Sequence, residues 1–253
     1  MRHLIASAQR AIAVASAMPL ANALAKGTGI AASVIIATRN KASYLDLTLA
    51  SLERQLFPAE MWEVVVADDA SQDDTTTILG KYVERGRLRL ASQRLLSSHG
   101  VAQSRRQAVE AAKGNILIFL GEDCLTTPDF LLHHLRHHLD SNNVVLGDCS
   151  RLVHTHLFAP AEVLLNGVSA RQVFEANDLN DLQALRPFIF HSGYDSRQDV
   201  LRPLAWVCSD AANASVKRET ALSDKAQTEQ TVCFEPRAYT IRQLRPRTPA
   251  PLL

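Results

Sequence analysis

The chain has 253 residues, of which 47% are hydrophobic and 21% charged, and its formal net charge is +1 at pH 7. This composition is ordinary for a protein that buries one sizeable core. A nearly balanced charge gives no overall field that would attract nucleic acid, so we expect no nucleic-acid partner and only local use of charge. No apolar run reaches the length needed to span a bilayer.

The cysteines are too far apart for a metal knuckle or a compact disulfide framework. None of them forms a C-x-x-C pair, so we expect free thiols in a reducing compartment. The four are Cys124, Cys149, Cys208 and Cys233.

Residues 1–32 are expected to form an N-terminal extension. Arg2 and Arg10 precede an Ala-rich apolar stretch, and the first acidic residue is Asp46, a pattern that resembles an export signal. The glycines of "GTG", however, lead almost directly into the strand-like "SVIIA". The favoured interpretation is therefore a helix that lies on the domain or on a membrane surface.

Four short runs predict β-strands. They are "SVIIA" (33–37), "EVVVA" (63–67), "RLRLA" (87–91) and "NILIFL" (115–120). Most are apolar almost throughout, which is typical of strands buried on both faces of a mostly parallel sheet. Because helical patterns separate them, the sequence predicts an α/β fold with helices flanking the sheet.

Helical periodicity follows the first two strands. "SYLDLTLASLERQL" places its leucines on one face, and Ser43 stands where the helix is expected to start. Asp73 and Asp74 stand at the head of the next predicted helix, where acidic residues interact favourably with the helix dipole.

Two further helices are predicted. "GVAQSRRQAVEAAKG" is the third, and we expect Gly114 to end it in the left-handed conformation. Thr127 as the cap and Pro128 at the first helical position predict the fourth. Its "HHLRHH" segment has i, i+4 histidine pairs that could bind zinc, but no third ligand is identifiable, so a histidine-rich surface is favoured.

Acidic residues directly follow two of the predicted strands. Asp68 and Asp69 follow the second strand, and Glu122 and Asp123 follow the fourth. Ligands of such sheets bind beyond the carboxyl ends of the strands, so we expect both pairs to face one cleft. A phosphorylated ligand would be repelled there unless a divalent cation lay between, and carboxylates suit Mg²⁺ or Mn²⁺. "ATRNKAS" contains no glycine, which excludes the usual dinucleotide turn.

Four segments in order resemble the donor half of the inverting family-2 glycosyltransferases with the GT-A fold. They are "SVIIATRNKASYLDLTLASL", "EVVVADDASQDDT", "GVAQSRRQAVEAAKGNILIFLGEDC" and "TPDFLLHHLRHH", with a weaker echo at "WVCSDAANASVKRETAL". The resemblance implies a nucleotide-sugar-binding half at 33–150 and a partial acceptor-side region at 151–222. An irregular C-terminal tail at 223–253 would follow.

The resemblance assigns nucleotide-binding roles to residues after the first two strands. Thr38 and the loop through Asn40 would lie against the nucleobase. Asp68, with Asp69 behind it, would bind the base or the ribose.

The resemblance places the metal at the acidic pair after the fourth strand. Asp123, with Glu122, would hold Mg²⁺ or Mn²⁺ at the family's D-x-D position, although Gly121 replaces the first Asp. Arg105 would support Asp123 or the phosphates, and Arg106 replaces the family's usual Asn.

The implied reaction is a metal-assisted single displacement with inversion. A UDP-sugar is the expected donor, and a saccharide, a lipid or another cell-surface or secondary-metabolite molecule the acceptor. We expect a cytoplasmic protein that can associate peripherally with the inner face of the membrane. The family's base lies in an E-D motif that residues 223–253 lack; Asp210 and Asp224 are the nearest carboxylates and neither matches, so no base is assigned.

Two alternatives remain at this point. The chain could be a catalytically inactive nucleotide-sugar-binding module that lacks the base. It could also be a receiver-like signalling domain that holds Mg²⁺ with Asp68 and Asp69. That fold needs an Asp after the third strand and a Lys after the fifth, and neither "RLRLASQ" nor "VVLGDCS" supplies them.

Overall fold

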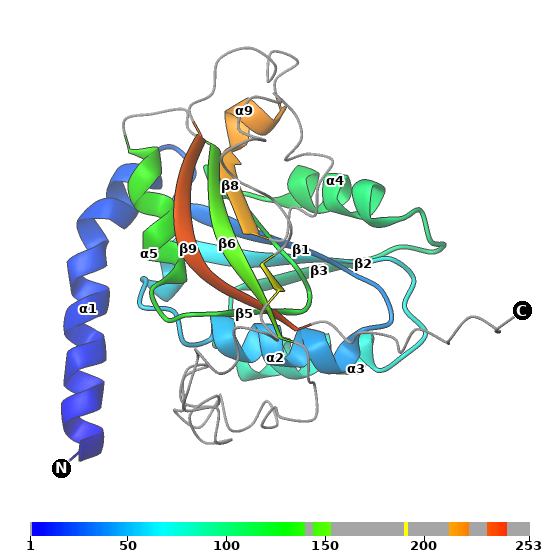
Figure 1. Cartoon of the computed structure of the whole chain (residues 1–253), viewed down its shortest axis with the longest axis horizontal. Helices are drawn as coiled ribbons and strands as arrows, with labels where there is room; N and C mark the ends of the chain where they lie inside the picture. The colour runs from blue at the N-terminus through cyan, green and yellow to red at the C-terminus, as the bar shows by residue number, and fades with distance from the viewer. Residues whose placement is uncertain (1, 140–143, 153–189, 192–212, 223–231, 242–253) are drawn as a thin grey trace, which may run out of the picture.

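The structure, a computed structural model, describes residues 2–139, 144–152, 190–191, 213–222 and 232–241 (Figure 1). Its helices are α1 (Arg2–Leu24), α2 (Ala42–Leu52), α3 (Thr75–Arg85), α4 (Val101–Ala111), α5 (Phe130–Leu135) and α9 (Arg218–Leu222), with 3-10 helices η1 (Ala59–Met61) and η2 (Arg136–His138). Its strands are β1 (Ala32–Thr38), β2 (Trp62–Asp68), β3 (Leu90–Arg94), β4 (Ile116–Leu120), β5 (Cys124–Thr126), β6 (Val144–Leu152), β7 (Phe190–His191), β8 (Asn213–Lys217) and β9 (Val232–Ile241).

The strands form one sheet in the order β3-β2-β1-β4-β8-β6-β9-β5, and β7 pairs with β6. The first four strands are parallel to one another. Every antiparallel pair involves β5 or a later strand. The predicted α/β class is confirmed, and its parallel part is the half of the sheet that carries the predicted site.

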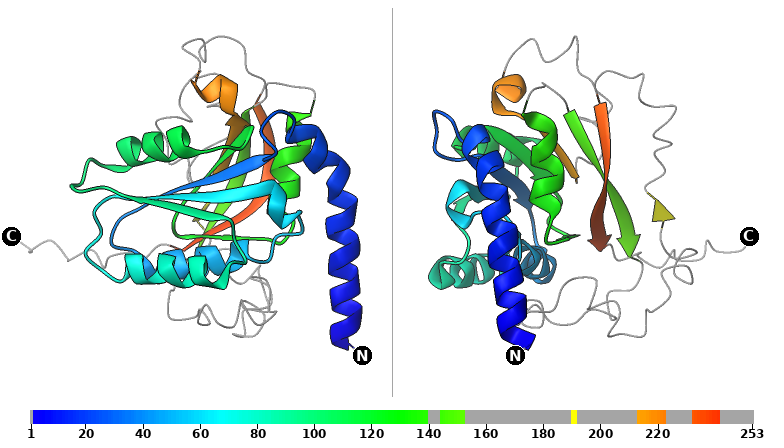
Figure 2. Two further views of the ribbon diagram at one scale, coloured as in Figure 1. Left: turned by 180° about the vertical axis from the view of Figure 1, so that it is seen from behind. Right: turned by 90° about the vertical axis from the view of Figure 1, so that its left-hand side faces the viewer.

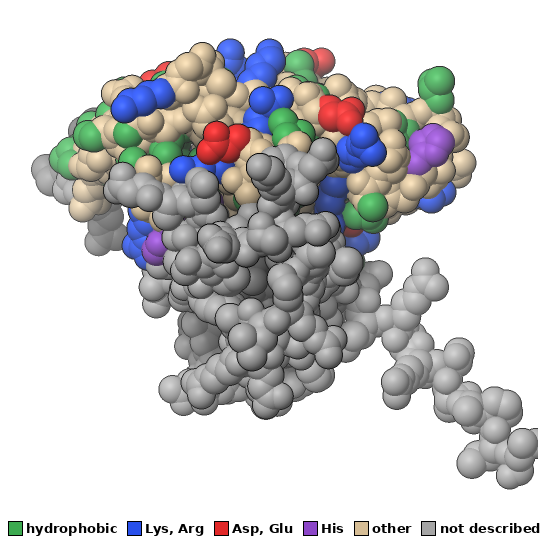
Figure 3. Space-filling model, turned by 90° about the horizontal axis from the view of Figure 1, so that it is seen from above, with side chains coloured by type: hydrophobic (Ala, Val, Ile, Leu, Met, Phe, Trp, Pro, Cys, Tyr) green, Lys and Arg blue, Asp and Glu red, His purple; other side chains and the backbone are tan. Residues whose placement is uncertain are grey.

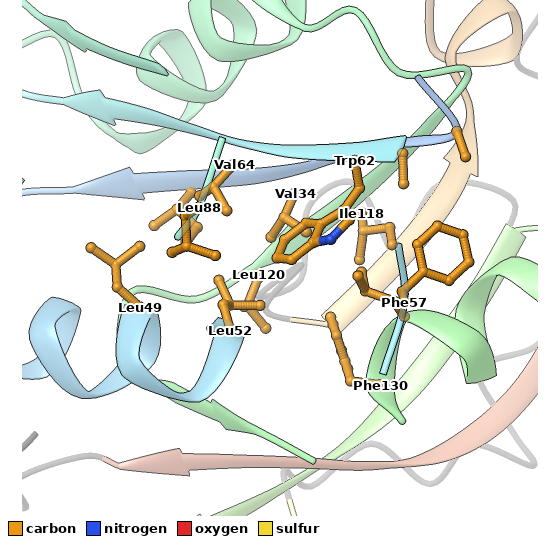
Figure 4. Close-up of a cluster of buried hydrophobic side chains, with 14 of the residues drawn as sticks. Val34, Leu49, Leu52, Phe57, Trp62, Val64, Leu88, Ile118, Leu120 and Phe130 are labelled. Atoms are coloured by element: carbon orange, nitrogen blue, oxygen red, sulfur yellow. The ribbon is translucent and has the colours of Figure 1, made fainter. Parts of the chain in front are cut away.

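Helices cover both faces of the parallel strands (Figures 1 and 2). Alternate residues of β1, β2 and β4 point to opposite faces, which lets each strand contribute to two hydrophobic clusters. The smaller cluster packs under α4 and includes Ile35, Val65, Ala108 and Leu117. The larger cluster lies between the sheet and α2 (Figure 4); its labelled members are Val34, Leu49, Leu52, Phe57, Trp62, Val64, Leu88, Ile118, Leu120 and Phe130.

Helix α1 lies along one side of the domain, and its N-terminal half extends beyond the body (Figures 1 and 2). Arg10 anchors it to the end of α2 by donating to the backbone carbonyls of Glu53, Arg54 and Gln55. Ile12 remains largely exposed. Among the described residues, no helix is both long enough and apolar enough to cross a membrane.

Two predicted helix starts are wrong, for tertiary reasons. Helix α2 begins after Lys41, and its first amide, that of Ala42, donates to Asp73 Oδ2 from a neighbouring loop at 2.9 Å. Helix α5 begins after Asp129. The carbonyls of Thr127 and Pro128 instead accept hydrogen bonds from the segment after α2.

The predicted end of α4 is also wrong. The helix ends at Ala111, and Ala112 is already extended, with φ −66° and ψ 140°. Gly114 does not adopt a positive φ. It is required for another reason, because a Cβ there would lie 2.4 Å from the backbone of Ala32 and Ser33 in β1.

Two strands differ from the sequence pattern. β3 begins at Leu90 rather than at residue 87, because parallel pairing with β2 starts at Val64 opposite Leu90. Within the C-terminal tail at 223–253, which was expected to be irregular, residues 232–241 form β9, which pairs with β6 and β5.

The expectation of a histidine-rich surface is wrong for two histidines. His134 and His138 are 2% and 0% exposed. Their rings share the hydroxyl of Ser215 on β8, with N–O distances of 2.9 and 2.8 Å, and His134 also contacts Asn213 Oδ1 at 2.7 Å. Burial, reinforced by the nearby charges of His134, Lys217 and His137, lowers the pKa of His138 to about 3.

Candidate functional site

The predicted site residues stand at the carboxyl ends of adjacent parallel strands. Thr38 ends β1 and pairs in register with Asp68, which ends β2. On the other side of β1, the last pair with β4 is Ile35 and Phe119. Thr38 and Glu122 each follow three residues after that pair, so all three strands end at the same edge of the sheet.

Two buried oxygen atoms at this edge have no hydrogen-bond partner in the described part of the chain. They are Thr38 Oγ1 and Asp68 Oδ2. Asp68 is 1% exposed, and its Oδ2 lies 3.8 Å from Arg94 Nε, which is too long for a hydrogen bond. Its other oxygen accepts from the backbone amide of Ser71 at 3.0 Å. Buried polar atoms are normally satisfied, so this pair indicates a place for a ligand's donor groups.

Asp69 is turned toward a different loop. Its carboxylate accepts hydrogen bonds from the Ser98 hydroxyl at 2.7 Å and from the amides of His99 and Gly100 at 2.8 and 3.1 Å. Burial alone would raise the pKa of Asp69, but these donors outweigh it and lower that pKa. The carboxylate therefore fixes the loop between β3 and α4.

The loops after β1 and β2 are tied together. The Asn40 amide donates to Ser71 Oγ at 2.9 Å, and Asn40 Oδ1 accepts from the Gln72 amide at 2.7 Å. Asn40 and Ala70 both adopt a positive φ, of 53° and 57°. Such backbone geometry persists only where its surroundings enforce it, and functional sites are where it gathers.

The acidic pair after β4 surrounds a lysine that the sequence patterns did not single out. Lys41 Nζ lies 2.8 Å from Glu122 Oε1 and 3.4 Å from Asp123 Oδ2. Burial would lower the pKa of Lys41, but the hydrogen bonds and negative charges of the two acids outweigh it and raise that pKa. The sequence signal for this contact was the place of the lysine, three residues after β1, at the edge of the sheet where the acidic residues were expected.

The two arginines of α4 differ in their surroundings. Arg105 is half-buried. Arg106 is exposed and pairs with Glu110 one turn later, with 3.1 Å between Arg106 Nε and Glu110 Oε1. A surface pair of this kind contributes little to stability.

Arg94 is another basic residue at this edge that the patterns missed. It donates to the Ser71 carbonyl at 2.7 Å and to Thr76 Oγ1 at 3.0 Å. On the face seen in Figure 3, basic and acidic side chains are interspersed over the described part of the molecule.

The chemistry of the acidic pair fits a divalent cation. Two carboxylates converge on one positively charged atom, Lys41 Nζ, and carboxylate oxygen is a preferred ligand of Mg²⁺ and Mn²⁺. Among the described residues, no group of three Asp, Glu, His or Cys side chains could hold a metal unaided. Further ligands would have to come from water or from a bound phosphate. Asp210 and Asp224 lie outside the described residues.

Comparisons with known proteins show which family this chain is similar to. Residues 33–155 match the family described as Glycosyl transferase family 2. Validoxylamine A glucosyltransferase of Streptomyces hygroscopicus is 33% identical over 157 residues, which are 60% of this chain and 37% of that protein. Poly(ribitol-phosphate) beta-N-acetylglucosaminyltransferase TarS of Staphylococcus aureus is 31% identical over 56% of this chain and 22% of its own. The matched part of this chain thus spans 37% of the length of the first relative and 22% of the length of the second.

A solved structure supports the fold across more of the chain. It is mannosyltransferase PcManGT of Pyrobaculum calidifontis in complex with GDP-Man and Mn²⁺, with a TM-score of 0.52 and 18% identity. The superposition covers 97% of this chain and 68% of that one. Residues 33–155, just under half of this chain, thus match glycosyl transferase family 2, and the fold is that of the GT-A glycosyltransferases.

Proposed function

We propose that the protein transfers a sugar from a nucleoside diphosphate sugar, with a UDP-sugar as the first donor to test. The observation that carries this proposal is a pair of buried oxygens, Thr38 Oγ1 and Asp68 Oδ2, that have no hydrogen-bond partner among the described residues. A nucleobase or ribose offers N–H and O–H donors that would satisfy both. Leaving such atoms unsatisfied costs about 1–3 kcal/mol each, so a ligand that pairs them binds with that advantage.

The contacts of the proposed nucleotide-binding residues support their roles. Asp68 accepts a hydrogen bond from the base or ribose, and Thr38 and Asn40 line the same edge. Asp69 acts indirectly, because its carboxylate already holds the loop that leads into α4. Arg105, on that helix, contributes positive charge toward the phosphates or Asp123.

Glu122 and Asp123 would hold Mg²⁺ or Mn²⁺ together with oxygens of the donor's diphosphate. The ion would supply positive charge that stabilises the departing nucleoside diphosphate. The Thr48 hydroxyl fixes the backbone of the pair by donating to the Glu122 carbonyl at 2.8 Å. Two carboxylates rather than three should bind the ion weakly in the absence of the donor.

The acceptor side is assigned by family resemblance. Residues 33–150 would bind the donor, and residues 151–222 would form part of the acceptor side. Residues 223–253 would form the C-terminal tail. A base on the acceptor side would take the proton of an acceptor hydroxyl as the hydroxyl oxygen attacks the anomeric carbon. The attack comes from the side opposite the leaving group, so the configuration is inverted. The acceptor is a saccharide, a lipid or a related cell-surface molecule, reached from the cytoplasm or the inner face of the membrane.

The names of the relatives support the general class of reaction. The Streptomyces relative is named as a glucosyltransferase and TarS as an N-acetylglucosaminyltransferase. The structural neighbour was solved with a nucleotide sugar and Mn²⁺. The match to residues 33–155 leaves the receiver-like alternative without support.

An inactive binding module is the second candidate function. It is favoured by one observation, that residues 223–253 lack the E-D motif in which the family's base lies. Such a module would keep the contacts of Thr38 and Asp68 and lose only the proton transfer.

The test combines binding with turnover on the full chain. UDP and GDP are titrated calorimetrically with Mn²⁺ present, and consumption of UDP-glucose and UDP-N-acetylglucosamine is followed with and without a panel of acceptors. The proposal predicts nucleotide binding that Asp68→Asn weakens about tenfold and Asp74→Asn, at an exposed neighbouring position, leaves unchanged. Binding without any sugar release supports the inactive module, and no nucleotide binding overturns both.

A further inference from the structure

Lys41 is held at both ends by parts of the site that are far apart in sequence. Its backbone belongs to the loop after β1, which Asn40 ties to Ser71 and Gln72 after β2. The next residue, Ala42, donates its amide to Asp73 Oδ2 at 2.9 Å. The position of the Lys41 backbone is therefore fixed by the loop that follows Asp68.

The other end of Lys41 reaches the acidic pair after β4. Nζ lies 2.8 Å from Glu122 Oε1 and 3.4 Å from Asp123 Oδ2, so one ammonium neutralises part of the charge of two carboxylates. The Asp123 side chain is 7% exposed and the Glu122 side chain 21%, whereas the Lys41 side chain is 39% exposed. Adjacent acids with so little access to water repel one another unless a cation lies between them.

We propose that Lys41 is a resident counter-ion that occupies the cation position between Glu122 and Asp123, and that a divalent metal enters only by displacing its ammonium. This inference rests on the proposed metal role of the acidic pair. A lysine side chain is flexible and half-exposed here, so the ammonium can leave without unfolding its neighbours.

The displaced ammonium needs a new anionic partner. The diphosphate of the donor is the negative group that the proposed function brings to this edge, and a monocation on a long stem is a common phosphate ligand. Metal and nucleotide should therefore bind with positive coupling, because each creates the site that the other uses. Without nucleotide, Lys41 should keep the metal affinity low.

The test measures binding of Mn²⁺ alone to the full chain, using the loss of the free-ion signal in electron paramagnetic resonance. Lys41→Met should bind Mn²⁺ about five- to tenfold more tightly than the unaltered protein, because the competing cation is gone. Lys41→Arg keeps the charge and should restore weak binding. Lys81→Met, on the exposed side of α3, is the matched control and should change nothing. If Lys41 had a purely structural role, Lys41→Met should instead lower the affinity for Mn²⁺.

The gain must also depend on the acidic pair. In Lys41→Met/Asp123→Asn the tighter binding should disappear, and its persistence would place the ion elsewhere and overturn the inference. Equal or weaker Mn²⁺ binding by Lys41→Met overturns it as well. A measurement on the unaltered protein covers the case of a misfolded variant: the Lys41 Nζ resonance should shift on saturation with Mg²⁺, and an unchanged resonance contradicts displacement.

These outcomes are separate from those of the proposed function. The metal titrations contain no nucleotide, so failure of UDP and GDP to bind would overturn the proposed transferase without altering the prediction for Mn²⁺. Conversely, normal nucleotide binding with no effect of Lys41 would leave the transferase in place and remove the counter-ion.

Discussion

The amide of Gly114 donates to the hydroxyl of Ser33 at 2.8 Å, and the two backbones approach so closely that a Cβ on Gly114 would lie 2.4 Å from Ser33 N. The same hydroxyl donates to Glu63 Oε1, which also accepts from the Lys113 amide. This buried network joins the turn before β4 to β1 and β2 and sets the relative positions of the strands whose ends form the site.

Gly114→Ala should therefore destabilise the domain by about 1–3 kcal/mol, because backbone rather than a flexible side chain must move to admit the methyl group. The measurement is urea-induced unfolding followed by circular dichroism. Gly80→Ala is the control. Gly80 lies inside α3 with open space around it, so the added methyl should stabilise the helix by about 0.5–1 kcal/mol. A neutral Gly114→Ala would contradict the close approach.

Burial of His138 should make stability depend on pH. Its pKa is about 3 in the folded state against an ordinary 6.5, so between these values the unfolded chain binds a proton that the folded chain does not. Stability attributable to His138 is thus present at high pH and is lost as pH falls below about 6.5, by about 1.4 kcal/mol per pH unit. His138→Gln should remove this slope. Parallel curves of unfolding free energy against pH for the two proteins would contradict the buried neutral ring.

Asp69→Asn should loosen the loop between β3 and α4. An amide NH₂ in place of one carboxylate oxygen would face donors rather than accept from them. We expect faster hydrogen exchange at the amides of His99 and Gly100, with Asp74→Asn as the control. Unchanged protection of these two amides would mean that other contacts hold the loop.

Arg10 should control the attachment of α1. Arg10→Gln removes the hydrogen bonds to the carbonyls after α2, so limited proteolysis within residues 7–16 should speed up severalfold while unfolding free energy changes by less than about 1 kcal/mol. Cutting at the rate of the unaltered protein would show that the buried Ala17 and Ala21 suffice to hold the helix.

Elements with strong local patterns could be predicted from sequence. The apolar runs of β1, β2 and β4 and the leucine face of α2 are short-range signals, and they placed Asp68 and Asp123 at the sheet edge where the structure has them. The start of α2 was missed because its capping oxygen, Asp73 Oδ2, comes from another loop. Gly114 suggested a helix end, but a glycine is required there because the backbone contacts β1, more than 80 positions earlier in the sequence.

The contacts that were missed join residues distant in sequence. His134 and His138 are buried by Asn213 and Ser215 on β8, which no local pattern near the histidines indicates. Lys41 resembles any loop lysine until the ends of β1 and β4 are brought together. Acidic pairs after strands predict where a cation would bind, and only the fold shows that the chain supplies one of its own.

Nucleotide and metal should bind next to each other across the ends of β1, β2 and β4. UDP affinity measured with and without Mn²⁺ tests this most directly, in the unaltered protein, Asp68→Asn and Asp123→Asn. We predict that Mn²⁺ tightens UDP binding to the unaltered protein, that Asp123→Asn abolishes this gain, and that Asp68→Asn lowers affinity by the same factor with or without the ion. UDP affinity that is unchanged by Mn²⁺ and by both substitutions would contradict a shared site for nucleotide and metal.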